Sequence, residues 1–241
     1  MSHALHFRGV HKAFGRPVLT GLSGTVSTRE VTFVAGASGS GKSVLCRLAA
    51  GLLRPDAGEV ELFGESVHHL PERALLALRR RAPYLVQGPA LLDWRTLREN
   101  AALADRSASP ERVLEALARV GLADLADRLP TQVGPGAKKR TAIARALVLA
   151  PEYLLMDEPT TGLDRVATAQ VEQVLVDLKR SGLGALVVSH DYRLLSALAD
   201  RVLVVAQGRT AFIGTPAEFL ASSLPEVRAL TAPYLEMAAD G

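Results

Sequence analysis

The amino-acid sequence predicts an α/β protein with a mostly parallel sheet, and three observations support this fold class. A short apolar strand at 31–35 leads into a glycine-rich loop and then into a helix. A second apolar strand, at 153–156, ends in two adjacent carboxylates. Strands and helices alternate on both sides of the stretch 88–150, whose own pattern is mostly helical. Such alternation is typical of domains built around a parallel sheet.

The loop between the first of these strands and its helix reads GASGSGKS, which fits the pattern G-x-x-x-x-G-K-[ST] of P-loop NTPases. Small residues at this junction let main-chain N–H groups point at phosphate oxygens, and the helix N-terminus adds a favourable dipole. We expect Lys42 to reach the β- and γ-phosphates and the Ser43 hydroxyl to hold Mg²⁺. A Gly/Ser-rich turn that fits by chance is the alternative, and the flanking strand and helix argue against it. The expected nucleotide-binding residues here are Gly36, Ala37, Ser38, Gly39, Ser40, Gly41, Lys42, Ser43 and Val44.

The elements before residue 88 follow from apolar alternation and from turn residues. Gly15 and Pro17 mark a turn that joins two N-terminal strands. Gly51 closes the helix after the loop, and three arginines end the next helix, where they complement its dipole. The strands and helices expected in this part span 5–14, 19–27, 31–35, 44–51, 58–64, 71–81 and 84–87.

A helical subdomain is expected at 88–150, inserted into the sheet domain. Ser109-Pro110 is a good helix start before the run 111–120, and 138–149 is a second amphipathic run. The later elements are expected at 153–156, 166–180, 185–188, 192–199 and 201–205, with a hairpin turn at 207–209 and short helices from Pro216 and Pro225. We therefore expect one domain over 1–241, in which 1–87 and 151–241 form the core and the β-subdomain.

The two carboxylates at the end of the strand 153–156 complete the expected site. A buried strand delivers its last side chains to the carboxyl end of a parallel sheet, where ligands bind. We expect Asp157 to hold Mg²⁺ and Glu158 to orient and deprotonate an attacking water. An acidic turn after a strand is the alternative, and the phosphate-binding loop upstream makes it the weaker one.

Charge, apolar runs and cysteine content limit the kinds of partner and the compartment to expect. The chain has 28 basic and 25 acidic side chains, and a net charge of +3 is too small to indicate nucleic-acid binding. Its apolar runs are shorter than a membrane span requires, and its single cysteine, Cys46, fits a reducing compartment. We expect a cytosolic protein or a soluble subunit that rests on a membrane partner.

The order and spacing of these motifs resemble the ATPase subunits of ABC transporters over essentially the whole chain. The resemblance implies an ATPase core with an N-terminal antiparallel β-subdomain and a helical subdomain. The run Asp157–Asp164 resembles their Walker B segment and D-loop, and Gln87 resembles their Q-loop glutamine. His190 resembles the switch histidine, and Phe14 the aromatic residue that stacks on adenine. The resemblance implies catalytic roles for Lys42, Glu158 and His190, and a metal site formed by Ser43, Gln87 and Asp157.

The same resemblance implies the assembly. Two ATPase subunits sandwich two ATP molecules with Mg²⁺ and drive a transmembrane permease. The protein is then cytoplasmic and peripheral on the inner face of the plasma membrane. Asp164, in the D-loop, would act on the opposite subunit.

One motif departs from the family. The signature is normally Leu-Ser-Gly-Gly-Gln, and the corresponding run here is Val-Gly-Pro-Gly-Ala, with Gly134 in place of serine and Pro135 in place of the first glycine. Gly136 is retained. In the family the signature binds the γ-phosphate held by the opposite subunit, so this contact is expected to be weakened while the helix still forms, because proline suits a first helical turn. Two assemblies fit this change: a homodimer with two weakened sites and slow hydrolysis, or a heterodimer in which a partner with an intact signature completes the site. The resemblance to a subfamily, described next, favours the homodimer.

The run Gln-Gly-Pro-Ala-Leu-Leu-Asp from Gln87 is similar to that of ATPases in Mla-type lipid transport systems, which work with MCE-family proteins. The triplet Lys138–Arg140 and the tail from Gly214 are similar as well, although the tail also resembles amino-acid importers. Phospholipid trafficking is therefore expected, with another importer or a weakly active, partner-dependent subunit as the alternatives. Trp94 and its leucine neighbours fit either packing or a groove for the permease.

Other protein classes fit less well. ABC proteins that act outside transport resemble tandem chains or chains interrupted by a coiled coil, whereas this sequence has one unit and no long heptad region. A small-molecule kinase needs a site for the acceptor, whereas the carboxylates and the histidine here indicate water as the nucleophile. Glu158 argues against a catalytically silent clamp, which has no need of a base.

Overall fold

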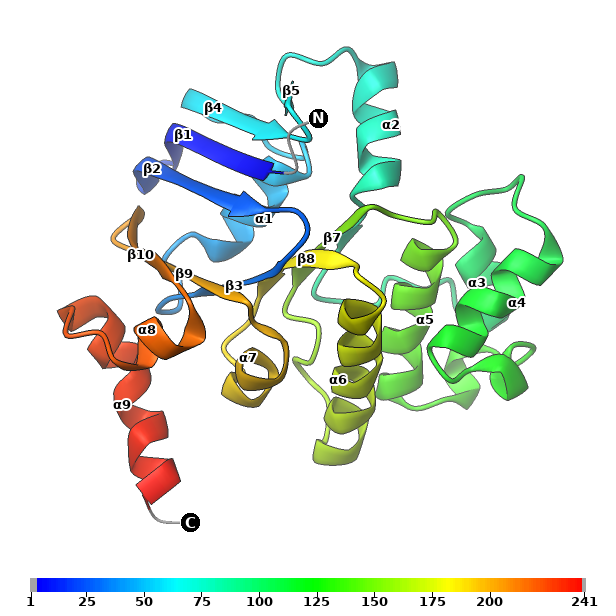
Figure 1. The fold of residues 1–241 in the computed structure, drawn as a ribbon. Helices are drawn as coiled ribbons and strands as arrows, with labels where there is room; N and C mark the ends of the chain where they lie inside the picture. The colour runs from blue at the N-terminus through cyan, green and yellow to red at the C-terminus, as the bar shows by residue number, and fades with distance from the viewer. Residues whose placement is uncertain (1–3, 240–241) are drawn as a thin grey trace.

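The computed structural model describes residues 4–239, and their side chains as far as residue 232. Two sheets and a group of helices make up the fold (Figure 1). The N-terminal sheet lies beside the larger sheet, and the green helices lie on the side away from it. None of the helices in the described chain is both long and apolar enough to cross a membrane.

The larger sheet is mostly parallel, as the sequence predicts. Its strand order is β10-β9-β3-β8-β7-β6, and only β10 runs antiparallel to its neighbour. All residues of β3, β7 and β8 are buried, because helices cover one face, helix α1 (Lys42–Ala49) and the smaller sheet cover the other, and these strands are almost continuous apolar runs. The strands are β3 (Val31–Ala35), β6 (Tyr84–Leu85), β7 (Tyr153–Asp157), β8 (Gly184–Val188), β9 (Arg201–Ala206) and β10 (Arg209–Gly214).

The smaller sheet is antiparallel and N-terminal, which confirms the second part of the predicted fold class. Its order is β2-β1-β4-β5, and its inward residues share a core with helix α1 (Lys42–Ala49). A fourth strand, β5, was not expected, and β4 ends at Leu62 because Phe63 and Gly64 turn the chain with positive φ. The strands are β1 (Ala4–Phe14), β2 (Arg16–Ser27), β4 (Ala57–Leu62) and β5 (Glu65–Ser66).

The helices that flank the sheets agree with the expected positions, with one difference in length. The last helix is not short but spans 15 residues. These helices are α2 (Glu72–Arg81), α6 (Arg165–Arg180), α7 (Tyr192–Leu198), α8 (Pro216–Leu220) and α9 (Pro225–Ala239).

Residues 88–150, all of which are described, form helices and turns without a strand. The helices are α3 (Leu97–Ala102), α4 (Pro110–Arg119) and α5 (Pro135–Leu147). Helix α3 was not predicted, although Thr96 and Glu99 form a capping box at its start. Helix α5 begins at Pro135, three residues earlier than expected. Its residue Ile143 belongs to an apolar cluster that continues into the large sheet, so this helical part packs on the sheet core.

Candidate nucleotide site

The loop 36–43 joins β3 to α1 and has the backbone that close approach to a ligand requires. Gly36, Gly39 and Gly41 have φ of 151°, 76° and 104°, a region that favours glycine. A Cβ on Gly36 would lie 2.3 Å from the Val205 carbonyl oxygen, and one on Gly41 would lie 2.7 Å from Leu19. The loop is therefore packed against β9 and β2 from behind, while its tip at 37–39 is exposed.

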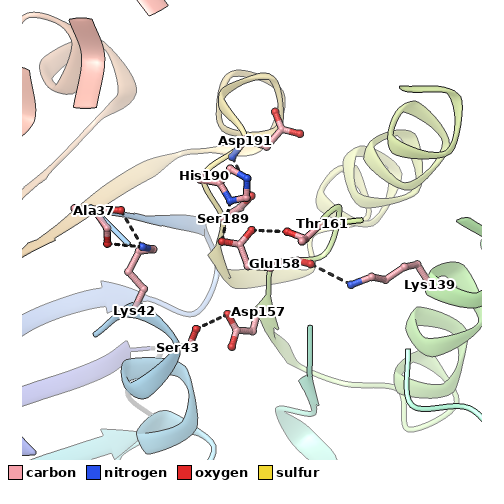
Figure 2. Close-up of polar contacts among 11 residues, drawn as sticks. Ala37, Lys42, Ser43, Lys139, Asp157, Glu158, Thr161, Ser189, His190 and Asp191 are labelled. Atoms are coloured by element: carbon pink, nitrogen blue, oxygen red, sulfur yellow. Dashed lines mark hydrogen bonds and ion pairs between the residues drawn. The ribbon is translucent and has the colours of Figure 1, made fainter. Parts of the chain in front are cut away.

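Lys42 lies across the mouth of this loop. Its Nζ donates to the carbonyl oxygens of Gly36 at 2.8 Å and Ala37 at 2.9 Å (Figure 2). Burial lowers the pKa of the Lys42 ammonium, and the nearby carboxylates of Glu158 and Asp157 oppose that shift. The buried Ser40 Oγ has no hydrogen-bond partner among the described residues. An ammonium and an unused hydroxyl at one loop suit an anionic ligand.

Asp157 ends β7 with a buried carboxylate that two hydroxyls hold in place. Ser43 Oγ donates to Oδ1 at 2.9 Å, and the hydroxyl of Tyr84 on β6 donates to Oδ2 at 2.9 Å. The expected pair of metal ligands is thus in direct contact although 114 residues separate them. Hydroxyl and carboxylate oxygens are the ligands that Mg²⁺ prefers, so this donor set fits the ion once phosphate oxygens complete it.

Glu158 follows directly and carries the expected base. Its Oε1 lies 3.0 Å from His190 Nδ1, and its Oε2 accepts a hydrogen bond from Thr161 Oγ1 at 3.0 Å (Figure 2). His190 follows β8, and Val188 at the end of β8 pairs with Asp157 at the end of β7. The carboxyl ends of neighbouring parallel strands therefore bring the base and the histidine together.

Gln87 lies two residues beyond β6, with its side chain exposed. Its carbonyl oxygen accepts a hydrogen bond from the buried Lys139, which also donates to the Glu158 carbonyl. The main chains at 87 and 158 therefore meet at one ammonium. A metal contact by the Gln87 amide stays a prediction.

Phe14 ends β1 and is 54% exposed, with Lys12 Nζ 5.5 Å from its ring centroid. Lys12 is itself held by Asp56 at 2.7 Å. An aromatic ring left open to solvent is suited to stacking. Its contact with adenine remains a prediction.

The expected signature segment, 133–137, overlaps the start of α5. Gly134 is the N-cap with no side-chain hydrogen bond, and Pro135 is the first helical residue. A Cβ on Gly136 would lie 2.7 Å from the Cβ of Ala167, so α5 and α6 begin side by side. Asp164 caps α6 in its own chain by accepting from the Ala167 amide at 2.8 Å. Gly134, Pro135 and Asp164 are exposed, which places the signature and D-loop residues on one surface.

Near the helical part, a cavity of about 180 Å³ lies between β6 and α5, lined in part by Val86, Leu103 and Arg145. Trp94 is 75% exposed, whereas Leu91 packs against the large core cluster. Leu91 therefore serves packing, whereas a contact of Trp94 with a permease stays a prediction.

Three residues that contact the site were not identified from sequence, namely Tyr84, Thr161 and Lys139. A signal existed for Lys139, which lies four residues before Ile143 on the apolar face of α5, where a lysine is unusual. Tyr84 and Thr161 carried no comparable signal.

Comparisons with known proteins identify the family. The family model described as ABC transporter matches residues 19–161. This chain belongs to the ABC transporter family. The methionine import ATP-binding protein of Caulobacter vibrioides is 40% identical over 213 residues, which cover 84% of this chain and 64% of that protein. The energy-coupling factor transporter ATP-binding protein of Methanothermobacter thermautotrophicus is 36% identical over 211 residues, covering 85% of this chain and 68% of that protein.

A solved structure has the same fold. It is a dimeric ATP-binding cassette in a post-hydrolysis state, bound to ADP and Pi, with a TM-score of 0.78 and 26% sequence identity. The match covers 88% of this chain and 98% of that one. This chain thus spans about two thirds of the length of the methionine import protein. Neither relative is named for lipid transport.

Proposed function

We propose that this chain binds ATP with Mg²⁺ at the loop 36–43, hydrolyses it to ADP and phosphate, and powers a membrane permease. The observation that carries this proposal is the Ser43–Asp157 contact of 2.9 Å beside the Glu158–His190 contact of 3.0 Å. A hydroxyl and carboxylate suited to Mg²⁺ and a base held by histidine meet at the carboxyl ends of adjacent strands.

The chemistry follows from these positions. The loop amides and Lys42 bind the phosphates, and Ser43 and Asp157 hold Mg²⁺, which when bound neutralises phosphate charge. Glu158 accepts a proton from the water that attacks the γ-phosphorus, and the bond to the bridging oxygen of ADP breaks. His190 orients the Glu158 carboxylate and stabilises charge that develops on the transferred phosphoryl group.

The second subunit enters through the surface formed by the starts of α5 and α6. In a dimer of the family type, Gly134, Pro135, Gly136 and Asp164 face the ATP of the opposite subunit. The lack of a serine hydroxyl at Gly134 and of an N–H at Pro135 supports slow hydrolysis. We favour a homodimer; a heterodimer with an intact signature on the other ATPase is the alternative.

Two cargo classes remain. Relatives at 36–40% identity support import of a small solute such as an amino acid. The run from Gln87 to Asp93 supports lipid trafficking with an MCE-family protein, in which case the subunit is cytoplasmic and peripheral on the inner membrane. Purification of the tagged chain with its native membrane partners distinguishes them: an MCE protein supports lipid transport, and a periplasmic solute-binding protein supports solute import.

Two variants test hydrolysis at this site. Lys42→Ala removes the ammonium at the loop and is expected to abolish ATP binding. Glu158→Gln removes the base while keeping the shape, so binding persists and hydrolysis falls by about 10²–10⁴-fold. Glu115→Gln, exposed on α4, is the matched control. Equal ATP binding by Lys42→Ala and the unmodified chain refutes the site, and full hydrolysis by Glu158→Gln refutes the assigned base.

A further inference from the structure

Lys139 is a buried cation to which the proposed reaction assigns no role. Only 7% of this residue is exposed, although it lies on a helix of the outer helical part. Its Nζ donates to the carbonyl oxygen of Glu158 at 3.0 Å and to that of Gln87. Figure 2 shows its side chain extending from α5 to the main chain beneath the Glu158 carboxylate. Both of these contacts are with main-chain oxygens. A buried lysine is costly to maintain, so these contacts require an explanation.

The peptide that Lys139 holds has an unusual conformation. Glu158 has φ of 51°, which is uncommon for a residue with a Cβ. Its amide donates to the Val188 carbonyl at 2.7 Å, and its own carbonyl accepts from Lys139. The N–H of Glu158 is thus anchored to β8, and its carbonyl oxygen is anchored to α5. The direction of the Glu158 carboxylate depends on this backbone, because the left-handed conformation turns the side chain toward His190.

Helix α5 holds the segment after β6 in the same way. Arg145 donates to the carbonyl oxygens of Ala90 at 2.7 Å and Pro89 at 3.1 Å. Ala90 also has a positive φ, of 46°. Together with Lys139, two cations of one helix bind three carbonyls of the segment 87–90. Lys139 is the member of this pair that also reaches the proposed catalytic residue.

We propose that Lys139 is a positioning residue for hydrolysis, which fixes the backbone of Glu158 to α5 and to the Q-loop segment. Its hydrogen bonds are made to main-chain oxygens, its charge is attracted by the Glu158 and Asp157 carboxylates, and it does not touch the reacting groups. The start of α5 carries the signature residues, so the position of that helix relative to the sheet sets the direction of the base. This inference rests on the proposed hydrolysis at this site.

The test compares three variants of the full chain. Lys139→Met removes all donors, and Lys139→Gln keeps a neutral donor that reaches one carbonyl. Lys179→Met is the control: Lys179 also donates to a main-chain carbonyl, that of Leu198 at 2.8 Å, near the opposite ends of the strands. For each variant we would measure kcat, the Kd for ATP with Mg²⁺, and the melting temperature.

We expect kcat to be highest in the unmodified chain, lower in Lys139→Gln and lowest in Lys139→Met. The loss of kcat in Lys139→Met is expected to be about 10–100-fold, which corresponds to one hydrogen bond from a charged donor. The Kd is expected to change by less than about threefold, because the loop is untouched. Lys179→Met is expected to lower the melting temperature without the loss of kcat. A kcat of Lys139→Gln no higher than that of Lys139→Met, or a parallel loss of ATP affinity, overturns the positioning role.

A second readout does not depend on hydrolysis. Amide hydrogen exchange at 86–91 and 154–161 is expected to be faster in Lys139→Met than in Lys179→Met, because only the first releases those peptides. Equal exchange in both variants overturns the link. If the unmodified chain binds ATP and does not hydrolyse it, the proposed function fails, and this exchange comparison alone then decides whether Lys139 fixes the Glu158 backbone.

Discussion

Removal of the Tyr84 hydroxyl is expected to weaken metal binding at the proposed site. This hydroxyl donates to Asp157 Oδ2 at 2.9 Å while Ser43 occupies Oδ1, so the carboxylate plane is fixed from both oxygens. Burial raises the pKa of Tyr84, which keeps the group a donor. Tyr84→Phe retains the ring and removes one hydrogen bond to a charged acceptor, worth about 1.5–3 kcal/mol. Loss of such a supporting contact typically lowers metal affinity about 10–100-fold.

The assay is a Mg²⁺ titration of ATP hydrolysis, with Mn²⁺ binding in the presence of ATP as the direct readout. Tyr153→Phe is the matched control, because Tyr153 on the neighbouring strand β7 is fully buried and its hydroxyl has no hydrogen-bond partner among the described residues. Its removal is expected to leave stability unchanged or raise it, without altering metal affinity. The same Mg²⁺ dependence in both variants would show that Tyr84 does not support Asp157.

Three further predictions concern α5 and the β-subdomain. Gly136→Ala places a Cβ 2.7 Å from that of Ala167 and is expected to cost about 1–3 kcal/mol, measured by thermal unfolding; an unchanged melting temperature contradicts this packing. Gly134→Ser adds a hydroxyl at an N-cap with open space, so stability is expected to rise by a few tenths of a kcal/mol. If the new hydroxyl contacts the partner's ATP, the rate of hydrolysis is expected to rise by about tenfold, and an unchanged steady-state rate rejects that contact. Burial lowers the pKa of His68 to about 4, below that of the unfolded chain at about 6.5, so stability is lost as the pH falls from about 6.5 toward 4. His68→Gln is expected to flatten that slope in urea unfolding at pH 7 and pH 5, and an unaltered slope excludes His68 as its source.

The elements that the sequence predicted best are those whose local residue pattern already determines their place in the fold. The strand before the loop was predicted at 31–35 and lies there, because a run of five residues between turns, four of them apolar, has few alternatives. Asp157, Glu158 and His190 were expected together, since all follow strands of one parallel sheet. Helix α3 was missed because six residues are too few for periodicity, even with a capping box. The start of α5 was placed late because the glycines beside Pro135 hide it.

The remaining part of the site depends on contacts between distant segments. Tyr84 and Asp157 are 73 residues apart, and Lys139 and Gln87 are 52 apart. No local pattern reports which carbonyl a lysine will reach. The spacing of the motifs therefore identified the groups proposed to do chemistry, whereas the groups that hold them became visible only through the packing of α5 and β6.

The proline at the start of α5 has a consequence for assembly. The ring of Pro135 fixes φ, and the neighbouring Gly136 is pressed against α6, so this exposed turn is rigid in the separate subunit. A surface that is already ordered loses little entropy when a second copy docks on it. In the proposed dimer, the stiffness of this turn would make association less costly than with a flexible glycine pair, and would offset part of the loss of the serine hydroxyl and of the N–H at Pro135.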